Sequence, residues 1–188
     1  MSTRSHIAIE DKKDKKIHSI YVHSDGYPNG VGHCHLTHYN SYEKAKDLFQ
    51  FGNASSLGST LKECSFYERD WGRNEEKAQR HNNEWCYVNS LNGDIFIEYI
   101  YLFKNGRWYI STQKSIDKKE LPHDMYEKHA NYLSVFCAIE EHEDYKPEEI
   151  DTDRPTEKEM IATIGPMLNK MFKPENVMVQ GHKKRKTN

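Results

Sequence analysis

The chain has 188 residues, of which 36% are hydrophobic and 30% are charged, and its formal net charge is −2. This balance argues against a protein that binds nucleic acid over its whole surface, because no general positive field is present. No apolar run reaches the roughly 20 residues that span a bilayer, and the N-terminal segment lacks the apolar core of a signal peptide, so we expect a cytoplasmic protein without a membrane partner.

The first part of the chain is predicted to form two strands and then a helical region. The strand pattern covers residues 2–10 and 17–24, and the charged segment DKKDKK between them is typical of a turn. Helical periodicity then covers residues 31–39 and 41–51, and Ser41 is the candidate N-cap of the second helix. The polar stretch that follows predicts a long loop with a short helix, or a lid.

A second group of strands is predicted from three segments rich in aromatic and β-branched residues, which favour a pleated surface. The segments are EWCYVNS at 84–90, DIFIEYIYLF at 94–103 and RWYIS at 107–111. Asn105 and Gly106 join the last two and predict a two-residue hairpin, because both residues tolerate positive φ. Within the middle segment only Glu98 interrupts two apolar faces, so we expect a strand covered on both sides. The buried carboxylate either pairs with a neighbouring side chain or has a raised pKa and acts as an acid, which makes Glu98 a catalytic candidate.

The remainder of the chain is predicted to add helices. Residues 113–144 carry a helical period and are expected to pack on the domain formed by 1–112, whereas the acidic segment 145–155 is typical of a linker. An amphipathic helix is expected at 156–173 and a basic, disordered tail at 174–188. Together the elements predict an α+β fold: a mainly antiparallel sheet of about five strands packed with helices, plus a C-terminal helical extension.

Three segments of the chain resemble one family of small bacteriophage-encoded proteins. The segments are YVHSDGYPNGVG, FGNASSLGS and EYIYLFKNGRWYIS, within residues 2–112, and the family pattern is YxHxDGYPxGVG, LGDxSSLG and EYxYLFxxGxWY. Ser24 departs from the expected Trp, and His33, Cys34 and His35 stand where the family is variable or apolar. Because the family has no settled activity, the resemblance implies only a phage accessory protein that acts in the cytoplasm of an infected bacterium.

The segment DGYPNGVG is the candidate ligand site. It places glycines before a predicted helix, where free backbone N–H groups and the helix dipole favour an anion. Glycine also lets a ligand approach the backbone closely. A competing interpretation is a pair of turns, one of them capped by Asp25. The residues expected to bind the ligand are Asp25, Gly26, Tyr27, Asn29, Gly30 and Gly32.

Histidines around this segment raise the question of a metal site. His35 and His38 are neighbours on a predicted helix, and His23 or Asp25 from the preceding loop completes a three-ligand set. No established metal spacing such as HExxH or paired cysteines is present, so we expect no metal and no other cofactor. The four cysteines form no C-x-x-C pair, which indicates reduced thiols.

The sequence therefore favours a binding protein over an enzyme. The predicted function is a host-takeover or anti-defence accessory protein of a phage, which binds a host protein or a small anionic or nucleotide-like ligand through DGYPNGVG. The alternative is a metal-assisted hydrolase of a nucleotide or phosphodiester that uses His23, Asp25 and His38. Nucleic acid is expected to bind only through the basic tail, and homo-oligomerisation stays open.

Overall fold

The computed structural model describes residues 2–73, 77–117, 135–150 and Ala162. The chain divides into two units, residues 1–154 and 155–188, and every helix and strand named below belongs to the first. The predicted C-terminal helix and basic tail lie outside the described residues, apart from Ala162. Among the helices of the described residues, none has the length and apolarity needed to cross a bilayer.

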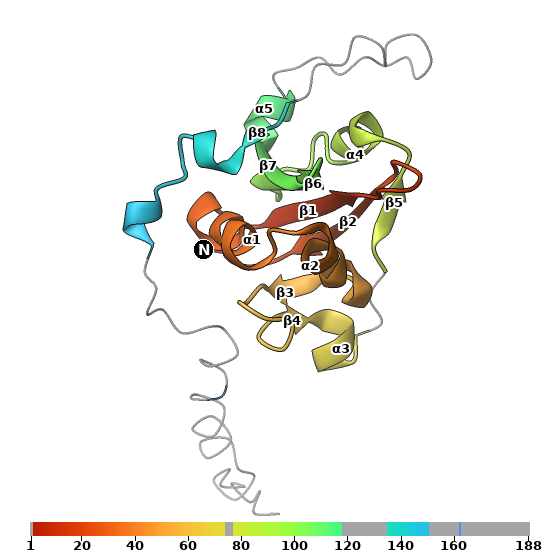
Figure 1. The fold of residues 1–188 in the computed structure, drawn as a ribbon, viewed down its shortest axis with the longest axis vertical. Coiled ribbons are helices and arrows are strands. Elements are labelled where there is room, and N and C mark those ends of the chain that lie inside the picture. The colour runs from red at the N-terminus through yellow and green to blue at the C-terminus, as the bar shows by residue number, and fades with distance from the viewer. Residues whose placement is uncertain (1, 74–76, 118–134, 151–161, 163–188) are drawn as a thin grey trace, which may run out of the picture. The chain divides into compact units, whose positions relative to one another are not determined.

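The described part of the first unit is built on one mixed sheet of eight strands (Figure 1). The strand order is β4-β3-β2-β1-β6-β7-β8, and β5 pairs with β2 off this path. The strands are β1 (Ser5–Glu10), β2 (Ile17–Val22), β3 (Ala54–Ser56), β4 (Ser65–Phe66), β5 (Gln79–His81), β6 (Tyr99–Lys104), β7 (Arg107–Thr112) and β8 (Cys137–Ala138).

The prediction of a mainly antiparallel sheet of about five strands is wrong. β1 pairs antiparallel with β2 but parallel with β6, and β2 also pairs parallel with β3. The physical reason is that hairpin signals report only strands that are neighbours in sequence, whereas a parallel pair joins strands separated by a long crossover. The coarser expectation of a fold that mixes helices and strands agrees with the structure.

The hairpins expected at DKKDKK and at Asn105–Gly106 are present, whereas the third strand expected at 84–90 does not form. Ser5 to Glu10 pairs in register with Ile17 to Val22 across the charged turn. In the β6–β7 hairpin Asn105 has φ 51° and Gly106 has φ 82°, the two positive values that a tight hairpin turn of this kind requires. The same residues that gave the turn signal therefore form the turn.

Short helical segments connect the strands. Ser41 is confirmed as an N-cap, because its side chain accepts a hydrogen bond from the Lys44 N–H at 3.4 Å. The segments are the π-helical turn η1 (Pro28–Gly32), α1 (His33–His38), α2 (Tyr42–Asp47), η2 (Leu48–Phe51), α3 (Tyr67–Trp71), α4 (Glu84–Ser90), α5 (Gln113–Asp117), η4 (Ile139–Glu141) and η5 (Pro147–Glu149).

Two expected elements differ in the structure. The predicted strand EWCYVNS is the helix α4, because Asn83 caps it by accepting the Cys86 N–H at 2.8 Å and its aromatic residues turn onto one apolar face. The end of the helix expected within 113–144 is instead the strand β8 followed by η4, since Cys137 and Ala138 pair with β7. Residues 118–134 of that predicted helix lie outside the described residues.

The sheet has an apolar core on each face, as the two apolar faces of the middle segment predicted. Tyr101 and Phe103 of β6 belong to the core that includes residues of α1 and α2, whereas Ile100 and Leu102 belong to the core that includes residues of α4. Alternate residues of β1 and β2 divide in the same way. The central strands are therefore buried on both sides, and polar residues on them are unusual.

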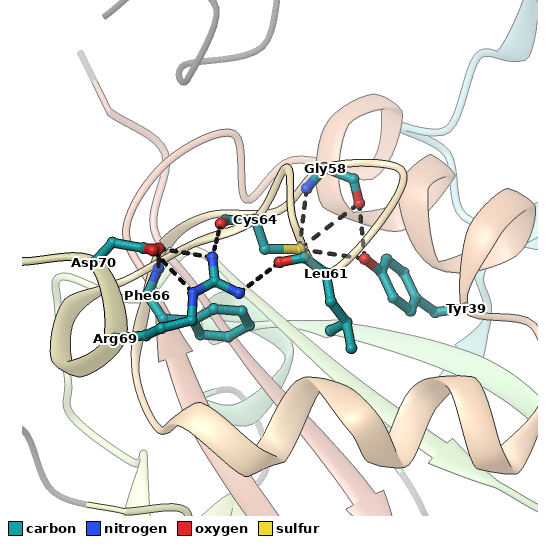
Figure 2. A network of polar contacts seen from close by, with 7 residues as sticks. All are labelled: Tyr39, Gly58, Leu61, Cys64, Phe66, Arg69 and Asp70. Atoms are coloured by element: carbon teal, nitrogen blue, oxygen red, sulfur yellow. Dashed lines mark hydrogen bonds and ion pairs between the residues drawn. The ribbon is translucent and has the colours of Figure 1, made fainter.

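A polar network fastens the loop between β3 and β4 to the end of α1 (Figure 2). The Tyr39 hydroxyl donates to the Gly58 carbonyl at 2.9 Å, and the Gly58 N–H donates to Cys64 Sγ at 3.3 Å. Arg69 donates to the Cys64 carbonyl and pairs with Asp70 at 2.7 Å. Burial raises the pKa of the Cys64 thiol, so the thiol stays protonated and its role here is structural. All four cysteines are free.

Candidate functional site

The DGYPNGVG loop is closed largely by its own backbone. The Val31 N–H donates to the Asp25 carbonyl at 2.8 Å, and the Gly30 N–H donates to the Tyr27 carbonyl at 2.9 Å. The Gly26 N–H donates to the Thr3 carbonyl at 2.9 Å. These three amides therefore already have acceptors within the chain. The binding role of Asp25, Gly26, Tyr27, Asn29, Gly30 and Gly32 stays a prediction.

Asn29 has a specific partner in the acidic segment that was expected to be a linker. Its side-chain amide donates to the Lys146 carbonyl at 2.8 Å and accepts the Lys146 N–H at 2.7 Å. Nearby, the Tyr145 hydroxyl lies 3.4 Å from His33 Nδ1, and Ile139 is fully buried beside Tyr101. The loop thus holds the chain segment from β8 to η5.

We expect Asn29→Ala to loosen that segment without unfolding the protein. The substitution removes two hydrogen bonds to the exposed backbone of Lys146, which corresponds to a loss of about 1–2 kcal/mol. The measurement is amide hydrogen exchange, in which the Lys146 N–H should exchange markedly faster in the variant. Asn40→Ala, an exposed residue beyond α1, is the control and should leave the Lys146 rate unchanged.

The three candidate metal ligands lie in different surroundings. His23 follows β2, and its Nδ1 lies 2.7 Å from the Tyr21 hydroxyl. His35 is fully buried, stacks on Trp108 at 3.7 Å and meets the Tyr101 ring edge-on at 5.4 Å. His38 is half-buried at the end of α1. Within the described residues no three His, Cys, Asp or Glu side chains are grouped so as to hold a metal ion.

Glu98 is not the buried carboxylate that the sequence predicted. Its side chain is exposed, and Glu98 lies just before β6, which begins at Tyr99. Its backbone N–H donates to the Arg4 carbonyl at 3.0 Å, and its side chain faces a shallow hollow of about 510 Å³ together with Tyr99 and Asp144. The burial on which the acid role of Glu98 depended is therefore absent.

A second hollow, which the sequence did not reveal, lies over β1 and β2 on the α4 face of the sheet. Its volume is about 550 Å³, within the about 300–1,000 Å³ that small-molecule sites occupy. We call it the Arg4–His6 hollow. Its polar and aromatic lining consists of Arg4, His6, Tyr21, Gln79, Ser90, Asp94 and Phe96.

His6 is the least usual group in this hollow. Its side chain is 7% exposed, and its Nδ1 is buried with no hydrogen-bond partner. Burial, assisted by the nearby His81, lowers the pKa of His6 to about 3, so the imidazole is neutral at physiological pH. Buried polar atoms nearly always have partners, so an unpartnered nitrogen on a residue that lines a hollow is unusual.

Arg4 and Phe96 form the rim of the hollow. The Arg4 guanidinium lies 5.5 Å from the centre of the Phe96 ring, and Phe96 is 62% exposed. The Asp94 carboxylate accepts the Phe96 N–H at 3.0 Å and so fixes the turn that presents the ring. Tyr21 stands between this rim and His23. The hollow therefore combines one cation, one carboxylate, a neutral imidazole and an exposed aromatic ring.

One signal in the sequence could have found these residues. Arg4 and His6 alternate with Ile7 and Ile9 along one strand, so both polar side chains lie on the same face of the sheet. The opposite wall of the hollow is formed by the turn around Asp94, which is far from Arg4 and His6 in sequence. No local sequence pattern links that turn to this strand.

No protein-family model, curated protein or solved structure matches this chain. The resemblance to phage-encoded proteins therefore stays a prediction, and function has to be inferred from geometry.

Proposed function

We propose that this chain is a binding protein that captures a small anionic ligand in the Arg4–His6 hollow. The observation that supports the proposal is the buried, unpartnered Nδ1 of His6 in a hollow that also carries the Arg4 guanidinium. The cation supplies attraction for an anion, and the neutral imidazole supplies a directional hydrogen bond.

Binding is favoured over catalysis by the chemistry of the same groups. A general base works best when its pKa is near the operating pH, and the pKa of His6 is lowered to about 3. Its imidazole is therefore suited to hydrogen bonding at neutral pH and poorly suited to proton transfer. No observation among the described residues favours the hydrolase alternative.

The hollow suits this role better than the DGYPNGVG loop does. A cradle needs backbone N–H groups that face an open space, and those of Gly26, Gly30 and Val31 are bonded to the chain's own carbonyls. In the setting that the phage resemblance suggests, the protein withdraws a ligand from the host during infection.

Recovery of the full chain with its ligand tests the proposal. The tagged protein is purified from bacterial cells, and the small molecules that it releases on denaturation are identified by mass spectrometry. We expect an anionic molecule to accompany the wild type and to be lost in Arg4→Gln, which removes the charge and keeps a polar side chain.

Arg107→Gln is the matched control. Arg107 lies on β7 outside the hollow, half exposed and 3.6 Å from Glu140, so it should retain the ligand. Equal thermal melting of both variants shows that the fold is intact. Retention of the same molecule by Arg4→Gln, or its absence from the wild type, would contradict the proposal.

A further inference from the structure

The rim of the Arg4–His6 hollow carries an aromatic side chain that packing does not explain. Phe96 is one of the exposed large hydrophobic residues of the described chain, with 62% of its surface in water. Single exposed apolar residues are common, but this one stands on a turn fixed by Asp94 and next to a guanidinium. An exposed ring beside a cation is an arrangement on which a nucleobase stacks, because every base has a flat π-face.

The interior of the hollow offers hydrogen bonds of both kinds. A neutral imidazole has one donor and one acceptor nitrogen, and Gln79 at the edge of the hollow has a side-chain amide with the same two capacities. The edge of a nucleobase likewise carries donors and acceptors side by side. A sugar phosphate or a simple dicarboxylate has no planar edge of this type.

The charges of the hollow limit the size of the anion. Arg4 is its only cationic side chain among the described lining residues, and Asp94 places a carboxylate nearby. One guanidinium matches one phosphate in bidentate geometry, whereas a triphosphate would bring further negative charge towards Asp94. A carboxylate accepts hydrogen bonds from ribose hydroxyls in other nucleotide sites, and the free acceptor capacity of Asp94 allows the same contact here.

We propose that the Arg4–His6 hollow binds a nucleoside monophosphate, with the base stacked on Phe96 and hydrogen-bonded towards His6, and with the phosphate on Arg4. The inference rests on the proposed function and names the ligand class of the same site. The ribose lies between base and phosphate, on the side of Asp94.

The test compares ligands by isothermal titration calorimetry with the full chain, after any co-purified ligand has been removed. The probes are the four ribonucleoside 5′-monophosphates, ribose 5-phosphate, which lacks the base, and the four nucleosides, which lack the phosphate. We expect at least one monophosphate to bind tenfold or more tightly than ribose 5-phosphate and than its own nucleoside, because base stacking and the phosphate contact each contribute.

Phe96→Leu separates stacking from simple apolar burial. It removes the ring and keeps an aliphatic side chain, so we expect about tenfold weaker binding of the monophosphate and no change for ribose 5-phosphate. Ile95→Ala is the matched control, since Ile95 is the neighbouring residue, 81% exposed, and lines the other hollow. It should bind like the wild type.

The two proposals fail in different ways. If ribose 5-phosphate binds as tightly as every monophosphate, and Phe96→Leu has no effect, the nucleotide inference is overturned while anion capture stands. If no phosphate probe binds and no anion accompanies the purified wild type, both proposals are overturned.

Discussion

The protein is expected to lose stability steeply as the pH falls below 6.5. Burial lowers the pKa of His6 and of His35 from 6.5 to about 3 in the folded chain. Between these values the unfolded chain binds protons that the folded chain does not, so acid favours unfolding, and the stability is fully present only above the unfolded pKa. Each histidine contributes a slope of up to about 1.4 kcal/mol per pH unit. For two histidines this amounts to about 3 kcal/mol between pH 6.5 and pH 5.

Urea unfolding measured at several pH values checks this expectation. The window from pH 6.5 to pH 5 lies above the range in which Asp11, Asp14 and Glu43 titrate, because backbone hydrogen bonds lower the pKa of each of these carboxyls. The loss in this window therefore reports histidine protonation. A free energy of unfolding that is constant from pH 6.5 to pH 5 would contradict the prediction.

His35 provides the matched variants for the same measurement. His35→Phe keeps an aromatic ring on Trp108 and removes both unpartnered nitrogens, so it should make the pH slope shallower by the share of one histidine, without loss at neutral pH. His35→Gln also removes the titration but leaves a buried amide, so it should have the shallow slope and a lower stability at all pH values. A wild-type slope in both variants would show that His35 is not the titrating group.

Local sequence signals predicted the local part of this fold and missed the rest. Asn105 and Gly106 form their turn because positive φ at two successive residues has few other solutions, and Ser41 caps its helix for a similarly local reason. The α4 residues were misread because their aromatic content suits a strand as well as a buried helix face. Tertiary packing decides between these two, and the N-cap residue Asn83 is a local signal that favours the helix.

The candidate site was predictable to a smaller degree. His23, His35 and His38 attracted attention because they crowd one segment, yet the structure places them in separate surroundings. Arg4 and His6 belong to the predicted strand 2–10 and carry no site signal of their own. In the structure, the parallel pairing of β1 with β6 brings the turn around residue 94 beside them, and the hollow lies between the two segments. The hollow is made by two distant segments, so the alternation along residues 4–9 could indicate one wall but not the hollow itself.

Gly30→Ala is expected to destabilise the protein by about 3 kcal/mol, because the space beside Gly30 is filled by backbone. A Cβ atom at this position would lie 2.2 Å from the Asp25 carbonyl oxygen. That oxygen accepts the Val31 N–H at 2.8 Å, so relief of the overlap costs the hydrogen bond that closes the loop. The measurement is the free energy of urea unfolding at neutral pH.

Gly32→Ala is the matched control for the unfolding measurement on Gly30→Ala. Gly32 belongs to the same motif, but a Cβ there would make ordinary contacts of 3.4 Å with Ile139 and Tyr101, so its variant should be close to the wild type in stability. If the glycines serve to approach a ligand, Gly30→Ala would instead weaken binding while unfolding like Gly32→Ala. Equal stability of the two variants would therefore contradict the packing role of Gly30. The DGYPNGVG loop would then again be a candidate ligand site. A large difference would mean that Gly30 serves the closure of the turn.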